Sequence, residues 1–135
     1  MKAMYIPEGY GTVFPYMLVD RAGEFVRFLQ EVFDATELGR TVTPNGRIAN
    51  VRMRIGTSAF MASEADREDN AMPATYYVYV GDVDGVLEKA VSRGATKMFD
   101  PADMPYGDRQ AGITDPFGNI WWISNRLVEK PYDEA

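Results

Sequence analysis

Two arginines on one short segment have a spacing that suits anion binding. Arg52 and Arg54 lie two residues apart in Ile48–Gly56, where Asn50 and the two arginines alternate with apolar residues. If the apolar set packs on a helix, the polar set shares the opposite face of a strand. Guanidinium groups match carboxylate and phosphate oxygens bidentately, so the pair could bind an anionic ligand. The spacing equally fits a solvated sheet, or ion pairs with Asp and Glu across a dimer.

Histidine and cysteine are both absent from the sequence. Their absence removes histidine bases, Ser-His-Asp triads, thiolate nucleophiles, disulfides and the usual His or Cys metal sites. A carboxyl group could still act as an acid or base, since burial can raise its pKa toward neutrality. Asp20, Asp82 and Glu64 are candidates, but they fall at predicted strand ends, where such residues usually cap turns or helices.

The elements that must position these residues follow one order twice, strand, helix and then further strands. The first run has a strand at Phe14–Asp20, a helix at Ala22–Phe33 and strands at Ala35–Val42, Ile48–Gly56 and Ser58–Ala65. The second run has a strand at Thr75–Asp82, a helix at Val83–Arg93 and two or three strands within Ala95–Phe99, around Gln110–Thr114 and in Asn119–Asn125. The order predicts an α+β fold with two βαβββ modules.

A shift of 61 positions relates the two runs. It pairs Tyr16 with Tyr77 and Ser63 with Ser124. Because the identity is weak, two similar strand-helix runs in any α+β protein could also produce it. With 135 residues, we expect one domain, with module 1 at about 12–65, a linker at 66–74, module 2 at about 75–126 and a C-terminal tail at 127–135.

Composition restricts the classes of partner. Hydrophobic residues make up 46% and charged residues 25%, which favours a globular chain over a disordered one. The net charge of -6 should repel the phosphate backbone of nucleic acids. Residues 1–11 lack the parts of a signal peptide, and no run reaches the roughly 20 apolar residues that span a bilayer. We therefore expect a cytoplasmic protein that binds neither nucleic acid nor membranes.

Four segments resemble the vicinal-oxygen-chelate superfamily, also called the glyoxalase/bleomycin-resistance/dioxygenase superfamily, and within it the PhnB-like branch. They are PYMLVD (Pro15–Asp20) before a helix ending EVFDA (Glu31–Ala35), GTSAFMASE (Gly56–Glu64), YVYVGDVDGVLEKAVSRGA (Tyr77–Ala95) and YGDRQAGITDPFGNIWWIS (Tyr106–Ser124). The resemblance implies curved mixed sheets around a cavity, a helix on the convex side of each sheet, and a homodimer. In YGDR, we expect Arg109 to order its loop, and we assign it no chemistry.

The resemblance also locates the positions where metal-dependent members carry His or Glu ligands. Aligned through LVD, GTSAF, YVGDVD and DPFGN, they fall on Phe14, Met61, Thr75 and Trp122. The separation is 47 residues in both modules, as a repeated module requires. Two aromatic rings, a thioether and a hydroxyl do not suit a divalent ion that needs imidazole and carboxylate ligands. Neither a metal nor another cofactor is expected.

An apolar cavity would then replace the metal centre. Tyr16, Tyr77 and Tyr79 would add aromatic faces with hydroxyl groups to this cavity. The predicted ligand-binding residues are Phe14, Tyr16, Arg52, Arg54, Met61, Thr75, Tyr77, Tyr79 and Trp122. Methionine and aromatic residues on strands also fit an ordinary core.

Three functions remain open. The first is a metal-free binder that sequesters an apolar or aromatic small molecule. The second is a metal-independent isomerase or lyase, in which Arg52 and Arg54 orient a small organic acid. The third is a non-catalytic scaffold dimer whose cavity is filled by Met61 and Trp122.

Overall fold

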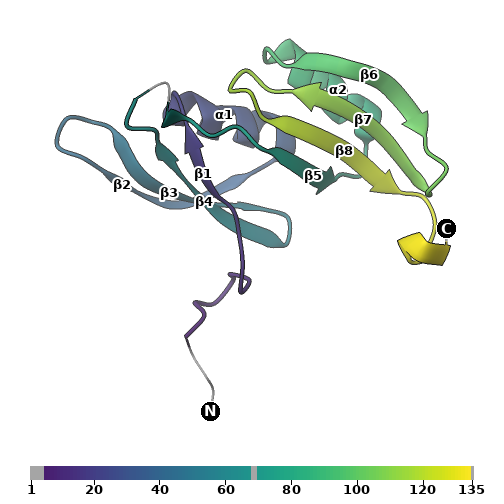
Figure 1. Ribbon diagram of the computed structural model, residues 1–135, viewed down its shortest axis with the longest axis horizontal. Helices are drawn as coiled ribbons and strands as arrows, with labels where there is room; N and C mark the ends of the chain where they lie inside the picture. The colour runs from purple at the N-terminus through teal and green to yellow at the C-terminus, as the bar shows by residue number, and fades with distance from the viewer. Residues whose placement is uncertain (1–4, 68–69, 135) are drawn as a thin grey trace. The chain divides into compact units, whose positions relative to one another are not determined.

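Figure 1 shows the computed structural model of the chain, which describes residues 5–67 and 70–134. The chain divides into two compact units, Met1–Met72 and Pro73–Ala135. Residues 68 and 69 of the predicted linker, residue 135 of the predicted tail and residues 1–4 of the amino-terminal stretch lie outside the described residues. No helix in the described part of the chain is long and apolar enough to cross a membrane.

The first unit is a βαβββ module, as predicted. It contains β1 (Tyr16–Val19), α1 (Ala22–Phe33), β2 (Thr36–Val42), β3 (Ile48–Ile55) and β4 (Ser58–Glu64). The strands form one sheet in the order β1-β4-β3-β2, in which β1 and β4 are parallel and the other pairs are antiparallel. Helix α1 is the connection between β1 and β2, at opposite edges of this sheet (Figure 1).

The second unit repeats this architecture. It contains β5 (Thr75–Tyr79), α2 (Val83–Ser92), β6 (Thr96–Asp103), β7 (Asp108–Thr114), β8 (Ile120–Arg126) and the 3-10 helix η2 (Tyr132–Glu134). Its sheet has the order β5-β8-β7-β6, with β5 and β8 parallel. The α+β fold with two βαβββ modules is therefore confirmed.

The predicted repeat extends to strand register. Tyr16 of β1 pairs with Met61 of β4, and the residues 61 positions later, Tyr77 and Trp122, pair with each other. Chance similarity between two strand-helix runs would not produce the same register. The two modules therefore place equivalent side chains at equivalent points of their sheets.

One face of each sheet packs on its helix. In the first unit the buried apolar side chains include Phe25, Leu29 and Val32 of α1, Val51 and Met53 of β3, and Phe60 and Ala62 of β4. In the second unit they include Val83, Leu87 and Ala90 of α2, Ala111 and Ile113 of β7, and Trp121 and Ile123 of β8. We call the other side of each sheet its open face, and the strand period of two assigns the alternate residues to it.

Carboxylates cap the starts of both helices. At α1, the residue before the helix is Arg21, in the left-handed region with φ of 59°, and it makes no side-chain cap. Instead the Glu64 carboxylate accepts hydrogen bonds from the backbone N–H groups of Arg21 and Ala22 at 2.9 and 2.8 Å. At α2, Asp82 accepts one from the Gly85 N–H at 3.0 Å. Glu64 and Asp82 therefore cap helices, as their positions suggested.

Several predicted strand boundaries were wrong, and the first strand, expected at Phe14–Asp20, spans Tyr16–Val19. The strand expected at Thr75–Asp82 ends at Tyr79, because Asp82 is used to cap α2. The strand expected at Ala95–Phe99 continues to Asp103, through Pro101. Proline cannot donate a hydrogen bond within a sheet, but β6 is an edge strand, and its register shifts between Phe99 and Ala102.

Candidate functional site

The open face of the first sheet gathers several predicted site residues around one amide. Tyr16 lies opposite Met61, and Met61 lies opposite Arg52. The Asn50 amide N–H group is 3.4 Å from the Tyr16 hydroxyl and 3.5 Å from the Met61 sulfur, while its oxygen accepts a hydrogen bond from Arg52 at 2.8 Å. We call these four residues the Asn50 cluster.

Arg54 and Phe14 flank the Asn50 cluster. Arg54 lies two residues beyond Arg52 on the same face of β3, and the chain passes close to its guanidinium at Gly9, where an added Cβ would lie 3.3 Å from Nη1. Phe14 precedes β1, and its ring centroid is 5.0 Å from that of Tyr10. The structure thus brings Tyr16, Arg52 and Met61 together, whereas Phe14 packs with the amino-terminal segment.

On the second sheet, Thr75 and Trp122, the two positions predicted to align with metal ligands, bond to each other. The indole N–H of Trp122 donates a hydrogen bond to the Thr75 hydroxyl at 2.8 Å. Indole nitrogen is a donor only and has no lone pair for a metal ion. The Trp122 ring also lies 6.0 Å from the Phe99 ring, between centroids. The Phe99 ring covers Gly112, where an added Cβ would lie 2.5 Å from the Cε1 atom of Phe99. A larger residue in place of Gly112 would therefore displace the ring.

Tyr77 and Tyr79 continue the aromatic surface along β5. Their ring centroids are 5.4 Å apart, and the residues are 45% and 56% exposed. Their hydroxyls are already engaged within the protein. Tyr77 donates to the Asp108 carboxylate, and Tyr79 bonds to the Tyr132 hydroxyl. The rings, more than the hydroxyls, are therefore the surface that these tyrosines offer to a ligand.

Asp108 is the centre of a polar network on β7 that sequence reasoning missed. It has no exposed surface. Besides Tyr77, it accepts hydrogen bonds from Tyr132 at 2.7 Å and from Arg126 at 3.0 Å. The Arg126 guanidinium carbon also lies 4.1 Å from the centre of the Tyr132 ring. These contacts fix the C-terminal residues against the end of the second sheet.

The network shifts the pKa values of its members. Burial alone would raise the pKa of Asp108, but hydrogen bonds from Tyr77, Tyr132 and Arg126 outweigh it and hold this pKa below the usual value. The pKa of Tyr77 is raised, first by partial burial and then by its bond to Asp108. Partial burial and the bonds to Tyr79 and Asp108 also raise the pKa of Tyr132. At neutral pH the network therefore contains one carboxylate and neutral phenols, an arrangement suited to structure more than to proton transfer.

Two sequence segments of the second unit that carry the family resemblance have structural partners. Arg109 of the YGDR segment forms ion pairs with Asp84 at 2.8 Å and Asp103 at 2.9 Å, so it joins α2 to β6. In the DPFGN segment, Asp115 accepts hydrogen bonds from the Asn119 backbone at 2.9 Å and the Trp121 indole at 2.8 Å. The side chains of both segments are thus engaged in structural contacts, and the open faces of the sheets are the stronger candidate for a ligand site.

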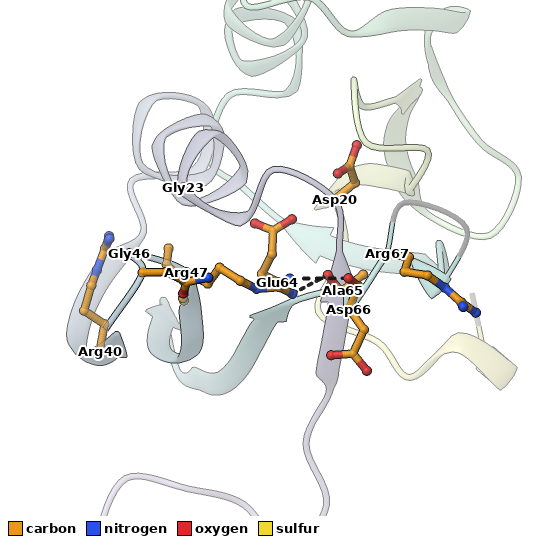
Figure 2. A pocket seen from close by; sticks show the side chains of 11 residues that line it. Asp20, Gly23, Arg40, Gly46, Arg47, Glu64, Ala65, Asp66 and Arg67 are labelled. Carbon is orange, nitrogen blue, oxygen red and sulfur yellow. Dashed lines mark hydrogen bonds between the residues drawn. The ribbon is translucent and has the colours of Figure 1, made fainter. Parts of the chain in front are cut away.

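A polar pocket of about 520 Å³ lies elsewhere in the first unit, near the start of α1. Figure 2 shows Arg47 reaching the backbone oxygens of Ala65 and Asp66, at 2.6 and 3.3 Å. Glu64, also in the pocket wall, is the cap of α1. Because these charged groups already serve the fold, the pocket is a weaker candidate than the open faces.

No group of three His, Cys, Asp or Glu side chains that could hold a metal ion occurs within residues 5–67 and 70–134. Around Trp122, the nearest polar partner is the Thr75 hydroxyl, which is engaged with the indole. The residues at these positions do not fit the ligand set that a divalent ion requires.

Comparison with known proteins identifies the family. Residues 12–123 match the model of the glyoxalase/bleomycin resistance protein/dioxygenase superfamily. An uncharacterised protein of Mycobacterium bovis is 30% identical over 131 residues, which cover 89% of this chain and 86% of that protein. The chain belongs to this superfamily.

Solved structures agree on the fold. TioX from Micromonospora superposes with a TM-score of 0.71 at 22% identity. The superposition covers 87% of this chain and 100% of the TioX chain. A PhnB protein from Bacillus cereus gives a TM-score of 0.67 at 14% identity, covering 85% and 99% of the two chains. At these identities the likeness concerns architecture alone.

Sequence reasoning placed the open-face residues but missed those that organise them. The alternation in the sequence assigns Asn50 to the face of the arginines but gives it no role, and it does not point to Asp108. The signal for Asn50 was its position two residues before Arg52 in an alternating strand. Asp108 had no such signal, because its partners Tyr77, Arg126 and Tyr132 come together only through strand pairing and the fold of the C-terminal segment.

Proposed function

We propose that this protein binds a small molecule with an apolar or aromatic group on the open faces of its sheets, without a metal ion. The exposure of three open-face tyrosines carries the proposal. Tyr16, Tyr77 and Tyr79 are 52%, 45% and 56% exposed, whereas the opposite faces of both sheets are buried under helices. Exposed rings on a sheet face are a common feature of ligand sites, because each offers a large apolar area, and within the second unit Tyr77 and Tyr79 lie side by side.

The chemistry of the metal-ligand positions supports the metal-free part of the proposal. The Trp122 indole donates a hydrogen bond to the Thr75 hydroxyl, and the Met61 sulfur accepts a weak hydrogen bond from the Asn50 amide. Each sheet thereby presents a polarizable, mainly apolar surface of its own, which suits a flat ligand. We place the chain in the PhnB-like branch on the strength of its YGDR and DPFGN segments, and expect it to sequester its ligand as a cytoplasmic homodimer.

Substitution of Trp122 tests the proposal. We use N-phenyl-1-naphthylamine, an uncharged aromatic probe whose fluorescence rises in apolar sites. Trp122→Ala should weaken its binding by more than about tenfold, since a buried aromatic contact of about 1.5 kcal/mol adds to the loss of apolar area. Trp122→Phe keeps a ring but loses the bond to Thr75, and should retain most of the affinity.

Tyr5→Ala is the matched control, because Tyr5 is an aromatic residue that is 80% exposed and lies outside both sheets. This control should bind the probe like the wild type. Circular dichroism of each variant verifies the fold. Unchanged affinity in Trp122→Ala would place the binding site elsewhere, and no binding to the wild type would contradict the proposed function.

A further inference from the structure

We propose that the ligand carries an anionic group, a carboxylate, sulfonate or phosphate, which Arg52 and Arg54 bind on the open face of β3. This inference rests on the proposed function and adds the chemical class of the ligand. The anionic group would lie at the two guanidinium groups, with the exposed ring of Tyr16 in the adjoining Asn50 cluster available to the apolar part of the ligand.

The two guanidinium groups lack carboxylate partners in the part of the chain that the structure describes. Among the described residues, the Arg54 side chain makes no hydrogen bond or ion pair, and the Arg52 side chain makes one hydrogen bond, to the Asn50 amide oxygen. Arg40 and Arg109, by contrast, are paired with acids. Arg40 bonds to Glu37 at 2.7 Å, and Arg109 to Asp84 at 2.8 Å.

Glu37, the acid whose pKa is affected by the charge of Arg52, is already hydrogen-bonded to Arg40. Hydrogen bonding to Arg40, and to a smaller extent the charges of Arg40 and Arg52, lower the pKa of Glu37. Both Glu37 oxygens accept hydrogen bonds from Arg40, at 2.7 and 2.8 Å. Glu37 therefore leaves the donors of Arg52 available for a ligand.

The local backbone leaves room for this arrangement. Arg52 lies against Gly39 of β2, where an added Cβ would be 2.9 Å from its Nη2 atom. Residues two apart in a strand are separated by about 6.6 Å, so the long side chains of Arg52 and Arg54 can converge on one group of oxygens. Guanidinium donors suit such oxygens because they form charge-assisted, often bidentate, hydrogen bonds.

A pair of probes with one aromatic framework separates the anionic group from the ring. The anionic probe is 8-anilinonaphthalene-1-sulfonate, and the neutral probe is N-phenyl-1-naphthylamine, which lacks the sulfonate. Both are titrated by fluorescence against the wild type and the double variant Arg52→Gln/Arg54→Gln. The variant should bind the anionic probe at least about tenfold more weakly and the neutral probe equally well.

Arg27→Gln/Arg93→Gln is the control, because it removes the same charge from exposed positions on α1 and at the end of α2. Its affinity for both probes should match that of the wild type. Equal loss of anionic-probe affinity in both double variants would reduce the effect to net charge and overturn the inference.

Two further outcomes distinguish the inference from the proposed function. If the neutral probe binds the wild type while the anionic probe binds the wild type and Arg52→Gln/Arg54→Gln equally, the inference fails and the proposed function stands. If neither probe binds the wild type, both fail. Thermal unfolding followed by circular dichroism shows that each variant is folded before its affinity is compared.

Discussion

Asp108 shows at the scale of one residue how a buried charge is retained in this fold. Its carboxylate has no exposed surface, and it is stabilised by two tyrosine hydroxyls and by Arg126. A buried carboxylate costs little only when its oxygens are fully hydrogen-bonded, as they are here. The C-terminal segment depends on this residue, because Tyr132 is anchored to it.

Asp108→Asn should lower the free energy of unfolding by about 3 kcal/mol at pH 7, since it leaves Arg126 without its charge partner. The folded-state pKa of Asp108 is lowered, so its stabilisation is full above the unfolded pKa of about 3.9 and is lost as pH falls through the folded value. Urea unfolding at pH 7 and near pH 3 measures both effects. The difference between wild type and variant should shrink at the lower pH.

Asp100→Asn is the control for this prediction, because Asp100 is paired with Lys97 on the surface and its side chain is 81% exposed. Such a pair should contribute little at either pH. A loss of stability in Asp108→Asn that is the same at both pH values would contradict the assigned role of the charge.

At the scale of the element, α1 depends on a residue from another strand. Arg21 precedes the helix in a left-handed conformation and does not cap it, so Glu64 at the end of β4 bonds to the first N–H groups. The carboxylate also lies near the positive end of the helix dipole. The start of α1 is thereby tied to the sheet on which the helix packs.

Glu64→Ala should destabilise the protein by about 1 kcal/mol, which lowers Tm by about 4 °C for a chain of this size. Thermal unfolding followed by circular dichroism at 222 nm measures the change. Glu88→Ala removes an exposed glutamate from α2 and should leave Tm nearly unchanged. A similar Tm for the two variants would show that Glu64 does not act as the cap.

The accuracy of the sequence-based elements followed the strength of the local pattern. The bounds of α1 were predicted to the residue, because Phe25, Leu29 and Val32 repeat at helical spacing. The predicted strand before Pro101 ended too early, at Phe99, because the sequence alone does not show that β6 is an edge strand, in which proline is tolerated. The face of the sheet on which Arg52 lies was predictable, because side chains alternate between the two faces of a strand. The hydrogen-bond network of Asp108 was not predictable in this way, because its members come together only through pairing of strands that are distant in the sequence.

At the scale of the whole molecule, the predicted homodimer and the absence of metal are tested together. Native mass spectrometry of the purified protein should show a species of twice the chain mass of 15.2 kDa, without bound metal. An additional organic mass would identify the class of the natural ligand. A monomer would contradict the expected assembly, and stoichiometric metal would contradict the alignment of Phe14, Met61, Thr75 and Trp122 with ligand positions.

The repeated strand order also bears on how the chain reaches its native state. Among residues 5–67 and 70–134, each strand pair joins residues of the same unit, and β1 pairs with β4 as β5 pairs with β8. The first sheet thus needs no residue beyond Glu64 to complete its strand pairing. During synthesis, the amino-terminal half can acquire its hydrogen-bonded sheet while the other half is still being translated. This order shortens the time for which its strands are open to wrong partners.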